Sequence, residues 1–241
     1  MILKYIMAEN QKLTRFDTGI DKLNKMLSGG FPEDSVIMLL GPPGIGKSSF
    51  CMQAAYRNAV KGTKVLYLTT GASPESVKET MKEFGFNLQQ NEKNIIFIDG
   101  YSWREGSRKN ENAGYVLKNM TNLTEAIVII KKALSDNDFK NGLVIVDSAS
   151  DFVMYADKRP LFKFFQILIA EIRENPKTIG LISIEEGMHD LKDVSTITYL
   201  ADGELQFEFN GENRFFKVNK MAQTHHTLDP INFEINKGKV V

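Results

Sequence analysis

The sequence predicts an α/β domain whose central sheet is mainly parallel and is extended by antiparallel strands toward the C-terminus. Three observations support this fold class. Apolar runs alternate with helical segments along residues 36–183, as in β-α-β units. A glycine-rich loop joins the first of these runs to a helix. From residue 194 onward, short strands alternate with turn signals. We expect a single domain over residues 1–241.

The N-terminal part is expected to contain little regular structure. Residues 1–16 carry a weak pattern that suits a short strand or arm. Residues 18–21 have the spacing of a capping box, with Asp in place of Glu, and predict the start of a short amphipathic helix. Gly29 and Gly30 should end that helix, and residues 31–34 should turn into the next strand.

The next stretch carries the strongest motif in the chain. Residues 36–40 are apolar and predict a buried strand, residues 41–48 read GPPGIGKS, and residues 49–60 have helical periodicity. This is the P-loop pattern G-x-x-x-x-G-K-[ST] in its strand–loop–helix context. The motif predicts a nucleotide-binding protein.

The chemistry of a P-loop explains its residue types. Glycines let backbone N–H groups approach a polyphosphate, and the start of the helix directs its positive dipole end at the same phosphates. Lys47 should reach the β- and γ-phosphates, and the Ser48 hydroxyl should bind Mg²⁺. The predicted nucleotide-binding residues of the motif are Gly41, Pro42, Pro43, Gly44, Ile45, Gly46, Lys47, Ser48 and Ser49.

The elements after the P-loop alternate between strand and helix. Residues 64–69 predict a strand. Ser73 and Pro74 have the residue types of an N-cap and a first helical position, so a helix should run from there to Phe84 and end at Gly85. Further predicted elements are strands at 94–99, 142–147 and 178–183, helices at 124–134 and 160–174, and C-terminal strands at 196–200, 203–209, 214–219 and 230–235.

Composition excludes several classes of protein. The 30 basic and 30 acidic residues cancel, which argues against a global attraction to nucleic acid or to an anionic membrane. The single cysteine, Cys51, rules out an intramolecular disulfide and a multi-cysteine metal site. No apolar run approaches the roughly 18 residues needed to span a bilayer. The N-terminal apolar stretch is too short for a secretory signal, so we expect a cytoplasmic protein.

A second carboxylate completes the predicted metal site. Asp147 ends the apolar run 143–146, which is the position of a Walker B acid. Such an acid holds Mg²⁺ through water beside the P-loop hydroxyl. The sequence therefore predicts Lys47 and Asp147 as catalytic residues, and Ser48 and Asp147 as the residues that hold Mg²⁺, through water.

Beyond these motifs, nearly the whole chain resembles the RecA-superfamily ATPases of the KaiC type, in particular the single-domain archaeal proteins. The resemblance is carried by pieces in the family's order: TGI at 18–20, GPPGIGKSS at 41–49, VLYLTTGASPES at 65–76, FIDGYSW at 97–103, VIVDSAS at 144–150, LADG at 200–203 and KMAQTHH at 220–226. It implies a RecA-like fold with ATP bound at a subunit edge. It also implies a homo-oligomer, either a ring or a dimer, with a protein partner as a further possibility.

The sequence departs from the family at two places that matter for hydrolysis. Where the family has a pair of glutamates that position the attacking water, this chain has Gly71 and Ala72. In the C-terminal motif that reaches a neighbour's nucleotide, the arginine is replaced by Ala222. An arginine supplied in trans contributes roughly 10³–10⁵ in rate. The matching positions of that motif are Lys220, Thr224 and His226.

The resulting hypothesis is an ATP·Mg²⁺-binding regulatory or scaffolding protein with weak or no hydrolysis. Two alternatives stay open. One is an active ATPase whose base is Glu185, Glu186 or Glu75. The other is a recombinase-like protein that binds single-stranded DNA through the aromatic and basic residues of the long segment 100–122, namely Tyr101, Trp103, Arg104, Arg108 and Lys109.

Overall fold

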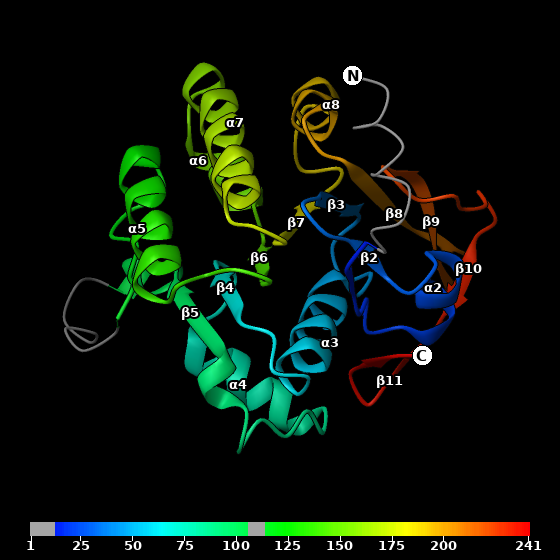
Figure 1. Ribbon diagram of the computed structural model, residues 1–241. Coiled ribbons are helices and arrows are strands. Elements are labelled where there is room, and N and C mark those ends of the chain that lie inside the picture. Colours follow the sequence, from blue (N-terminus) through cyan, green and yellow to red (C-terminus); the bar gives the residue numbers. More distant parts are fainter. Residues whose placement is uncertain (1–12, 106–113) are drawn as a thin grey trace, which may run out of the picture.

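The computed structural model describes residues 13–105 and 114–241 and is built around one large sheet (Figure 1). The sheet has eight strands in the order β10-β9-β8-β3-β7-β6-β4-β5. Strands β3 to β8 run parallel to their neighbours, and β9 and β10 continue the sheet in antiparallel fashion. The predicted fold class is confirmed. The strands are β3 (Val36–Gly41), β4 (Val65–Thr69), β5 (Ile95–Asp99), β6 (Leu143–Asp147), β7 (Ile179–Glu185), β8 (Gly203–Asn210), β9 (Asn213–Met221) and β10 (Ile231–Phe233).

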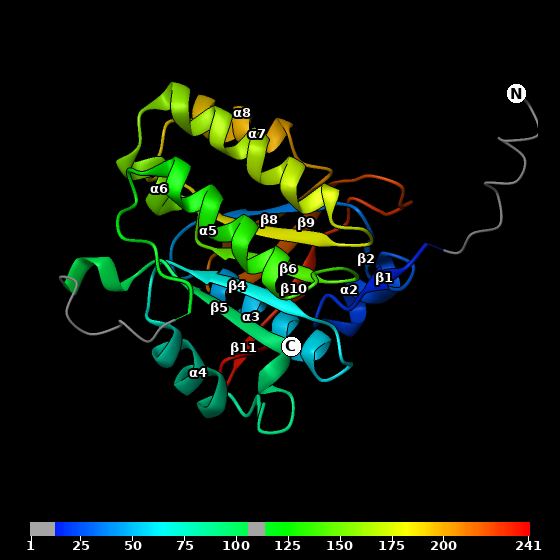
Figure 2. The same cartoon turned by 60° about the vertical axis from the view of Figure 1, so that its left-hand side comes forward.

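Helices cover both faces of this sheet (Figure 2). The helices are α2 (Asp21–Met26), α3 (Lys47–Ala59), α4 (Pro74–Glu83), α5 (Leu123–Asp136), α6 (Ser150–Tyr155), α7 (Lys158–Glu174) and α8 (Leu191–Tyr199). Helices α2, α3 and α4 lie on one face, and α5 to α8 lie on the other, so each face has its own apolar cluster. Because the central strands are buried on both faces, they read as unbroken apolar runs rather than as alternating patterns.

Most elements predicted for residues 36–183 are found within two residues of their expected ends. The P-loop strand, the helix after it and the strand that ends at Asp147 all occur where the motif places them. The Ser73 side chain caps α4 by accepting a hydrogen bond from the Ser76 N–H, as its residue type predicts. The additional short helix α6 was not among the predicted elements.

The predicted strand at 196–200 is wrong, because residues 191–199 form helix α8. Its run of β-branched residues favours a strand by local propensity. Burial at Val194, Ile197 and Thr198 instead follows the helical spacing, with that side packed in the cluster on the α5–α8 face. The Asp190 side chain caps the helix by accepting from the Lys192 N–H. Tertiary packing therefore overrides the propensity of this segment.

The capping box predicted at residues 18–21 is also absent. Helix α2 begins at Asp21, and its N-cap residue, Ile20, makes no side-chain cap bond. The Thr18 hydroxyl instead bonds both the N–H and the C=O of Ile20, in a tight turn before the helix. The Asp17 carboxylate accepts from the Gly19 N–H and organises the same turn.

Short strands flank the sheet at both ends of the chain. Strand β1 (Arg15–Phe16) pairs with β2 (Phe31–Pro32), and β11 (Ile235–Asn236) pairs with β12 (Lys239–Val240). The predicted strand at 230–235 is therefore two strands, β10 and β11, with Glu234 between them.

The buried Gln53 amide of α3 donates to the carbonyls of Gly19 and Val240 and accepts from the Val240 N–H. The P-loop helix is thus bonded to segments that precede β2 and to β12.

The long segment 100–122 is only partly described. It contains a short 3-10 helix at Ser102–Glu105, and its later part packs Leu117 and Met120 into the cluster on the α5–α8 face. Arg108 and Lys109 lie outside the described residues. Within the described ranges, no helix is long and apolar enough to cross a membrane.

Candidate functional site

The P-loop is placed by the close joining of β3 and α3. Gly46 is the N-cap residue of α3 and has φ of 114°, in a region that non-glycine residues rarely adopt. The helix therefore begins at Lys47, directly beneath the loop Pro42–Gly46. This geometry brings the helix N-terminus, with its unpaired N–H groups, to the carboxyl end of the parallel strands.

Lys47 is fully engaged with the protein. Its ammonium group donates to the carbonyls of Gly41 at 2.8 Å and Pro42 at 2.9 Å, and to Oε2 of Glu185 at 2.5 Å. A lysine ammonium has three N–H donors, so all three are used here. The Lys47 side chain is only 2% exposed and that of Glu185 is 23% exposed. A phosphate that binds Lys47 must therefore displace one of these acceptors.

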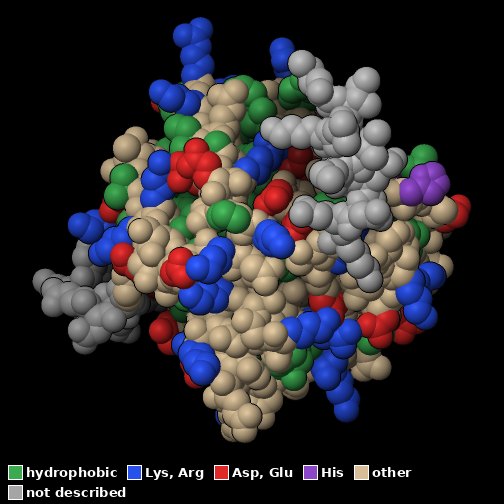
Figure 3. Space-filling view, viewed as in Figure 1, with side chains coloured by type: hydrophobic (Ala, Val, Ile, Leu, Met, Phe, Trp, Pro, Cys, Tyr) green, Lys and Arg blue, Asp and Glu red, His purple; other side chains and the backbone are tan. Residues whose placement is uncertain are grey.

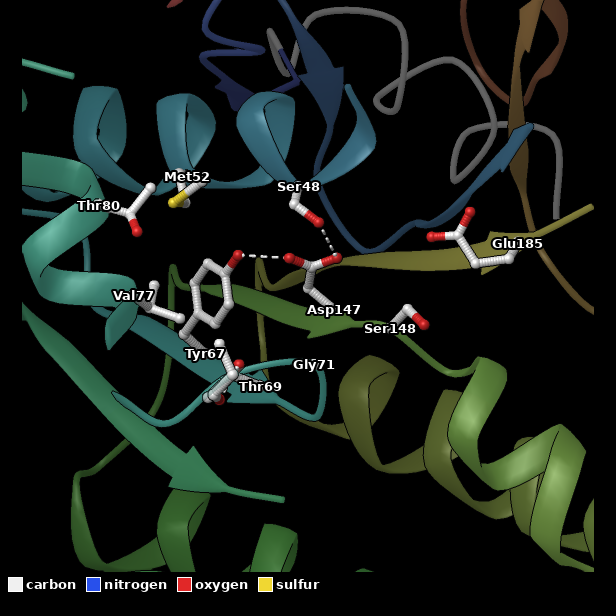
Figure 4. Close-up of a pocket in the computed structure, with 11 residues that line it drawn as sticks. Ser48, Met52, Tyr67, Thr69, Gly71, Val77, Thr80, Asp147, Ser148 and Glu185 are labelled. Carbon is white, nitrogen blue, oxygen red and sulfur yellow. Dashed lines mark hydrogen bonds between the residues drawn. The ribbon is translucent and has the colours of Figure 1, made fainter. Parts of the chain in front are cut away.

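Asp147 lies at the end of β6 and accepts hydrogen bonds from three hydroxyl groups. Its Oδ1 is 3.1 Å from Ser48 Oγ, and its Oδ2 is 2.8 Å from the Tyr67 hydroxyl (Figure 4). The same Oδ1 is 2.9 Å from Ser183 Oγ. The sequence predicted the meeting of Ser48 with Asp147, but not the contributions of Tyr67 and Ser183.

The donor set around Asp147 has the chemistry that a magnesium ion prefers. Mg²⁺ is bound by oxygen ligands, mostly through one or two protein groups plus waters and phosphates. The Ser48 hydroxyl uses its hydrogen on Asp147, which leaves its oxygen lone pairs available to a cation. The residues present therefore fit Mg²⁺: the Ser48 hydroxyl could bind the ion, and the Asp147 carboxylate could hold it through water.

A cavity of about 250 Å³ opens beside this pair. It is bordered by Ser48, Met52, Tyr67, Thr69, Gly71, Ala72, Val77, Thr80, Asp147, Ser148 and Glu185. Asp147 and Glu185 are its acidic groups, and the remaining polar lining consists of hydroxyls. A Cβ built on Gly71 would meet nothing within 4 Å, so the position expected to carry a glutamate in the family borders open space.

Three glutamates were predicted as candidate bases, and of these only Glu185 borders this cavity. Glu186 accepts a hydrogen bond from Gln206 at 2.5 Å and lines a different hollow, beside α8. Glu75 is exposed on α4, whereas Val77 and Thr80 of the same helix face the cavity. The geometry therefore brings Glu185 to the site and leaves Glu186 and Glu75 away from it.

The C-terminal candidates lie away from the cavity. The Lys220 ammonium, on β9, donates to the Ala201 carbonyl at 2.5 Å. The Thr224 hydroxyl accepts from the Arg15 guanidinium at 2.6 Å, and its carbonyl lies 3.1 Å from Nδ1 of His226. These contacts hold all three residues against their own chain.

Arg104, which the sequence singled out for nucleic acid, makes its polar contacts with its own chain. Its guanidinium donates to the Thr70 carbonyl at 2.7 Å and to Asp151 at 2.6 Å, and it lies about 5 Å from the Tyr101 and Trp103 rings. Thr70 directly precedes Gly71, so Arg104 supports the loop that borders the cavity. On the face shown in Figure 3, basic and acidic side chains are interspersed.

Comparison with known proteins gives a consistent result. A family model described as ATPase: KaiC matches residues 16–241. The chain is 27% identical to the UPF0273 protein PF1931 of Pyrococcus furiosus, with 94% of this chain and 93% of the relative covered. It is 31% identical to the UPF0273 protein MK0039 of Methanopyrus kandleri, with 92% and 88% covered.

A solved structure has the same fold. The crystal structure of the KaiC-like protein PH0186 from Pyrococcus horikoshii matches with a TM-score of 0.74. The match covers 95% of this chain and 99% of that chain at 18% sequence identity. At this identity the likeness concerns the fold alone, which is RecA-like.

Proposed function

This chain belongs to the KaiC family of ATPases, and from that premise we propose that it binds ATP with Mg²⁺ but hydrolyses it slowly or not at all. Binding, rather than turnover, then governs its assembly and its contacts with partners. The observation that carries this proposal is the border of the cavity beside Asp147. Gly71 and Ala72, which have no carboxylate, lie there in place of the family's two glutamates.

The binding half of the proposal rests on the P-loop. Lys47 would hold the β- and γ-phosphates by charge, and the backbone of the glycine-rich loop would donate to the phosphate oxygens. Ser48 and Asp147 would hold Mg²⁺, which neutralises phosphate charge when bound. These roles need no catalytic base, so binding survives the loss of the glutamates.

The hydrolysis half rests on which groups can accept a proton from water. A general base must lie within hydrogen-bond reach of the attacking water and must be free to accept its proton. Of the two carboxylates that border the cavity, Asp147 already accepts from three hydroxyls and Glu185 is paired with Lys47. We infer that Asp147 is not an efficient base. Glu185 is held by Lys47 until a phosphate displaces it, so its role as a base is decided by the variants below.

We further propose that the chain acts as one domain in a homo-oligomer, a ring or a dimer. In such an assembly Lys220, Thr224 and His226 would leave their present contacts and face a neighbouring subunit's nucleotide. Ala222 offers no cation at the position of the family's arginine, which would slow hydrolysis further.

Restoring the missing carboxylates tests this proposal directly. Gly71→Glu and Ala72→Glu should be accepted, because position 71 borders open space and position 72 is half-buried beside it. We expect wild-type ATP turnover close to that of a Lys47→Ala control, and a rise of at least tenfold in Gly71→Glu or in the double variant. ATP binding should persist in the wild type and be lost in Lys47→Ala.

The same experiment separates the competing mechanism, in which Glu185 is the base. That mechanism requires substantial wild-type turnover, on the order of one per second, which Glu185→Gln abolishes. Such a result would refute the proposal of weak hydrolysis. Nucleotide binding unchanged in Lys47→Ala would refute the binding site itself.

A further inference from the structure

Tyr67 is an unusual residue for the middle of a buried parallel strand. It is fully buried, and its ring packs on Phe97 with 5.6 Å between ring centroids. Its polar end is directed at Asp147 (Figure 4). A buried phenol finds a hydrogen-bond partner in most proteins, but here the partner is the acid of the proposed metal site.

The sheet register explains why this contact forms. On β4 and β6, Thr69 is paired with Asp147, so Tyr67 lies two residues before the partner of Asp147 and on the same face of the sheet. A phenol is long enough to bridge this offset along the strand. On the other side of β6, Ser183 of β7 follows Ile182, the partner of Val146, and therefore lies beside Asp147. The acid is thus flanked by a hydroxyl from each neighbouring strand.

The Tyr67 hydroxyl donates its hydrogen to Asp147. An ordinary phenol has a pKa of about 10, so it carries that hydrogen near neutral pH. Because a carboxylate has about four acceptor directions, hydrogen bonds from Ser48, Ser183 and Tyr67 leave about one of them unfilled.

We propose that Tyr67 is a positioning residue for the metal site, fixing the Asp147 carboxylate together with Ser183 so that its remaining acceptor direction serves Mg²⁺ and its hydration shell. This inference rests on the proposed binding of ATP with Mg²⁺ and adds the residues that orient the acid. Groups that orient a metal-site residue typically change metal affinity by 10–100-fold when they are removed.

The test measures metal dependence rather than turnover. Nucleotide affinity is titrated by calorimetry in EDTA and then at increasing Mg²⁺, for the wild type and for Tyr67→Phe. The variant keeps the buried ring and removes only the hydroxyl. We expect nucleotide affinity in EDTA within about twofold of wild type, and a Mg²⁺ concentration for half-maximal effect raised about tenfold. Tyr56→Phe is the matched control, because the Tyr56 ring stacks on Phe86 in the cluster of the same sheet face.

Ser183→Ala provides a second variant that acts on the other carboxylate oxygen, and it should shift the Mg²⁺ dependence in the same direction. Equal losses with and without Mg²⁺ would indicate general damage and overturn the proposal, as would wild-type Mg²⁺ dependence in both variants. Nucleotide binding unaffected by Lys47→Ala would instead refute the proposed nucleotide site. These outcomes are distinguishable in one series of titrations.

Discussion

Replacing Glu185 by glutamine should tighten nucleotide binding. In this structure the Glu185 carboxylate takes one of the three N–H donors of Lys47, at a distance of 2.5 Å. A nucleotide phosphate has to compete for that donor, and the displaced carboxylate then lies beside another anion. Glu185 therefore opposes the ligand twice, first as a competitor and then as a like charge.

The size of the effect follows from the position of the pair. Two unit charges about 4 Å apart interact by about 4 kcal/mol at an effective dielectric constant of about 20. The Glu185 side chain is 23% exposed, so it can turn toward water and relieve part of this repulsion. One third to two thirds of this Coulomb energy is about 1.3–2.7 kcal/mol. We therefore expect Glu185→Gln to bind ADP and ATP roughly 10–100-fold more tightly.

Calorimetric titration with ADP, ATP and AMP measures this effect. AMP lacks the β- and γ-phosphates that Lys47 would contact, so its affinity should change less than about threefold. Glu186→Gln is the matched control, because Glu186 is one residue further on and bonds Gln206 instead. Unchanged or weaker ADP binding in Glu185→Gln would refute the idea that this carboxylate competes with the phosphate.

Three further outcomes are expected. The Asp17 carboxylate is buried, which would raise its pKa, but hydrogen bonds from Lys61, Asn24 and the Gly19 N–H, with the charge of Lys61, lower that pKa to about 2. Asp17 therefore stabilises the fold above pH about 4, and that contribution is lost as the pH falls toward 2. Asp17→Asn should lower the free energy of unfolding, measured in urea at pH 7, by about 2 kcal/mol, and by progressively less below pH 4. The same substitution at the exposed Asp21 should change it little. Gly30→Ala should lower the free energy of unfolding in the same urea experiment by more than about 3 kcal/mol, because the new Cβ would lie 2.0 Å from the Phe16 carbonyl oxygen. Gly62→Ala, with a positive φ but open space, should cost only about 1–2 kcal/mol. The single tryptophan, Trp103, contacts Arg104, which supports the loop at the cavity, so its fluorescence should change on adding ATP·Mg²⁺ to the wild type and not to Lys47→Ala.

The core of the site could be predicted from the sequence because its geometry follows from local rules. A P-loop fixes a strand, a turn and a helix within a short stretch, and the carboxyl ends of parallel strands meet at one edge of a sheet. From these two facts the meeting of Ser48 with Asp147 can be predicted even when the strand order is not known. The absence of glutamates at Gly71 and Ala72 could likewise be recognised, because it needed only the family pattern.

The remaining contacts depend on register and packing, which no local pattern specifies. Tyr67 reads as one more apolar residue of a buried strand until Thr69 is paired with Asp147. Helix α8 was mistaken for a strand because its β-branched residues carry a strand propensity that burial overrides. The pairing of Lys47 with Glu185 joins residues 138 positions apart and required the order of the strands.

The bonds of Gln53 have a consequence for how the protein is made. This amide lies on the P-loop helix, near the start of the chain, yet two of its three hydrogen bonds are to Val240, 187 positions later. During synthesis the helix leaves the ribosome long before that partner exists, and an unsatisfied buried amide is costly. We therefore expect the nucleotide-binding helix to dock late in folding, after the C-terminal strands have been synthesised. A nascent chain halted before β12 should accordingly bind nucleotide poorly, although its entire P-loop has already been translated.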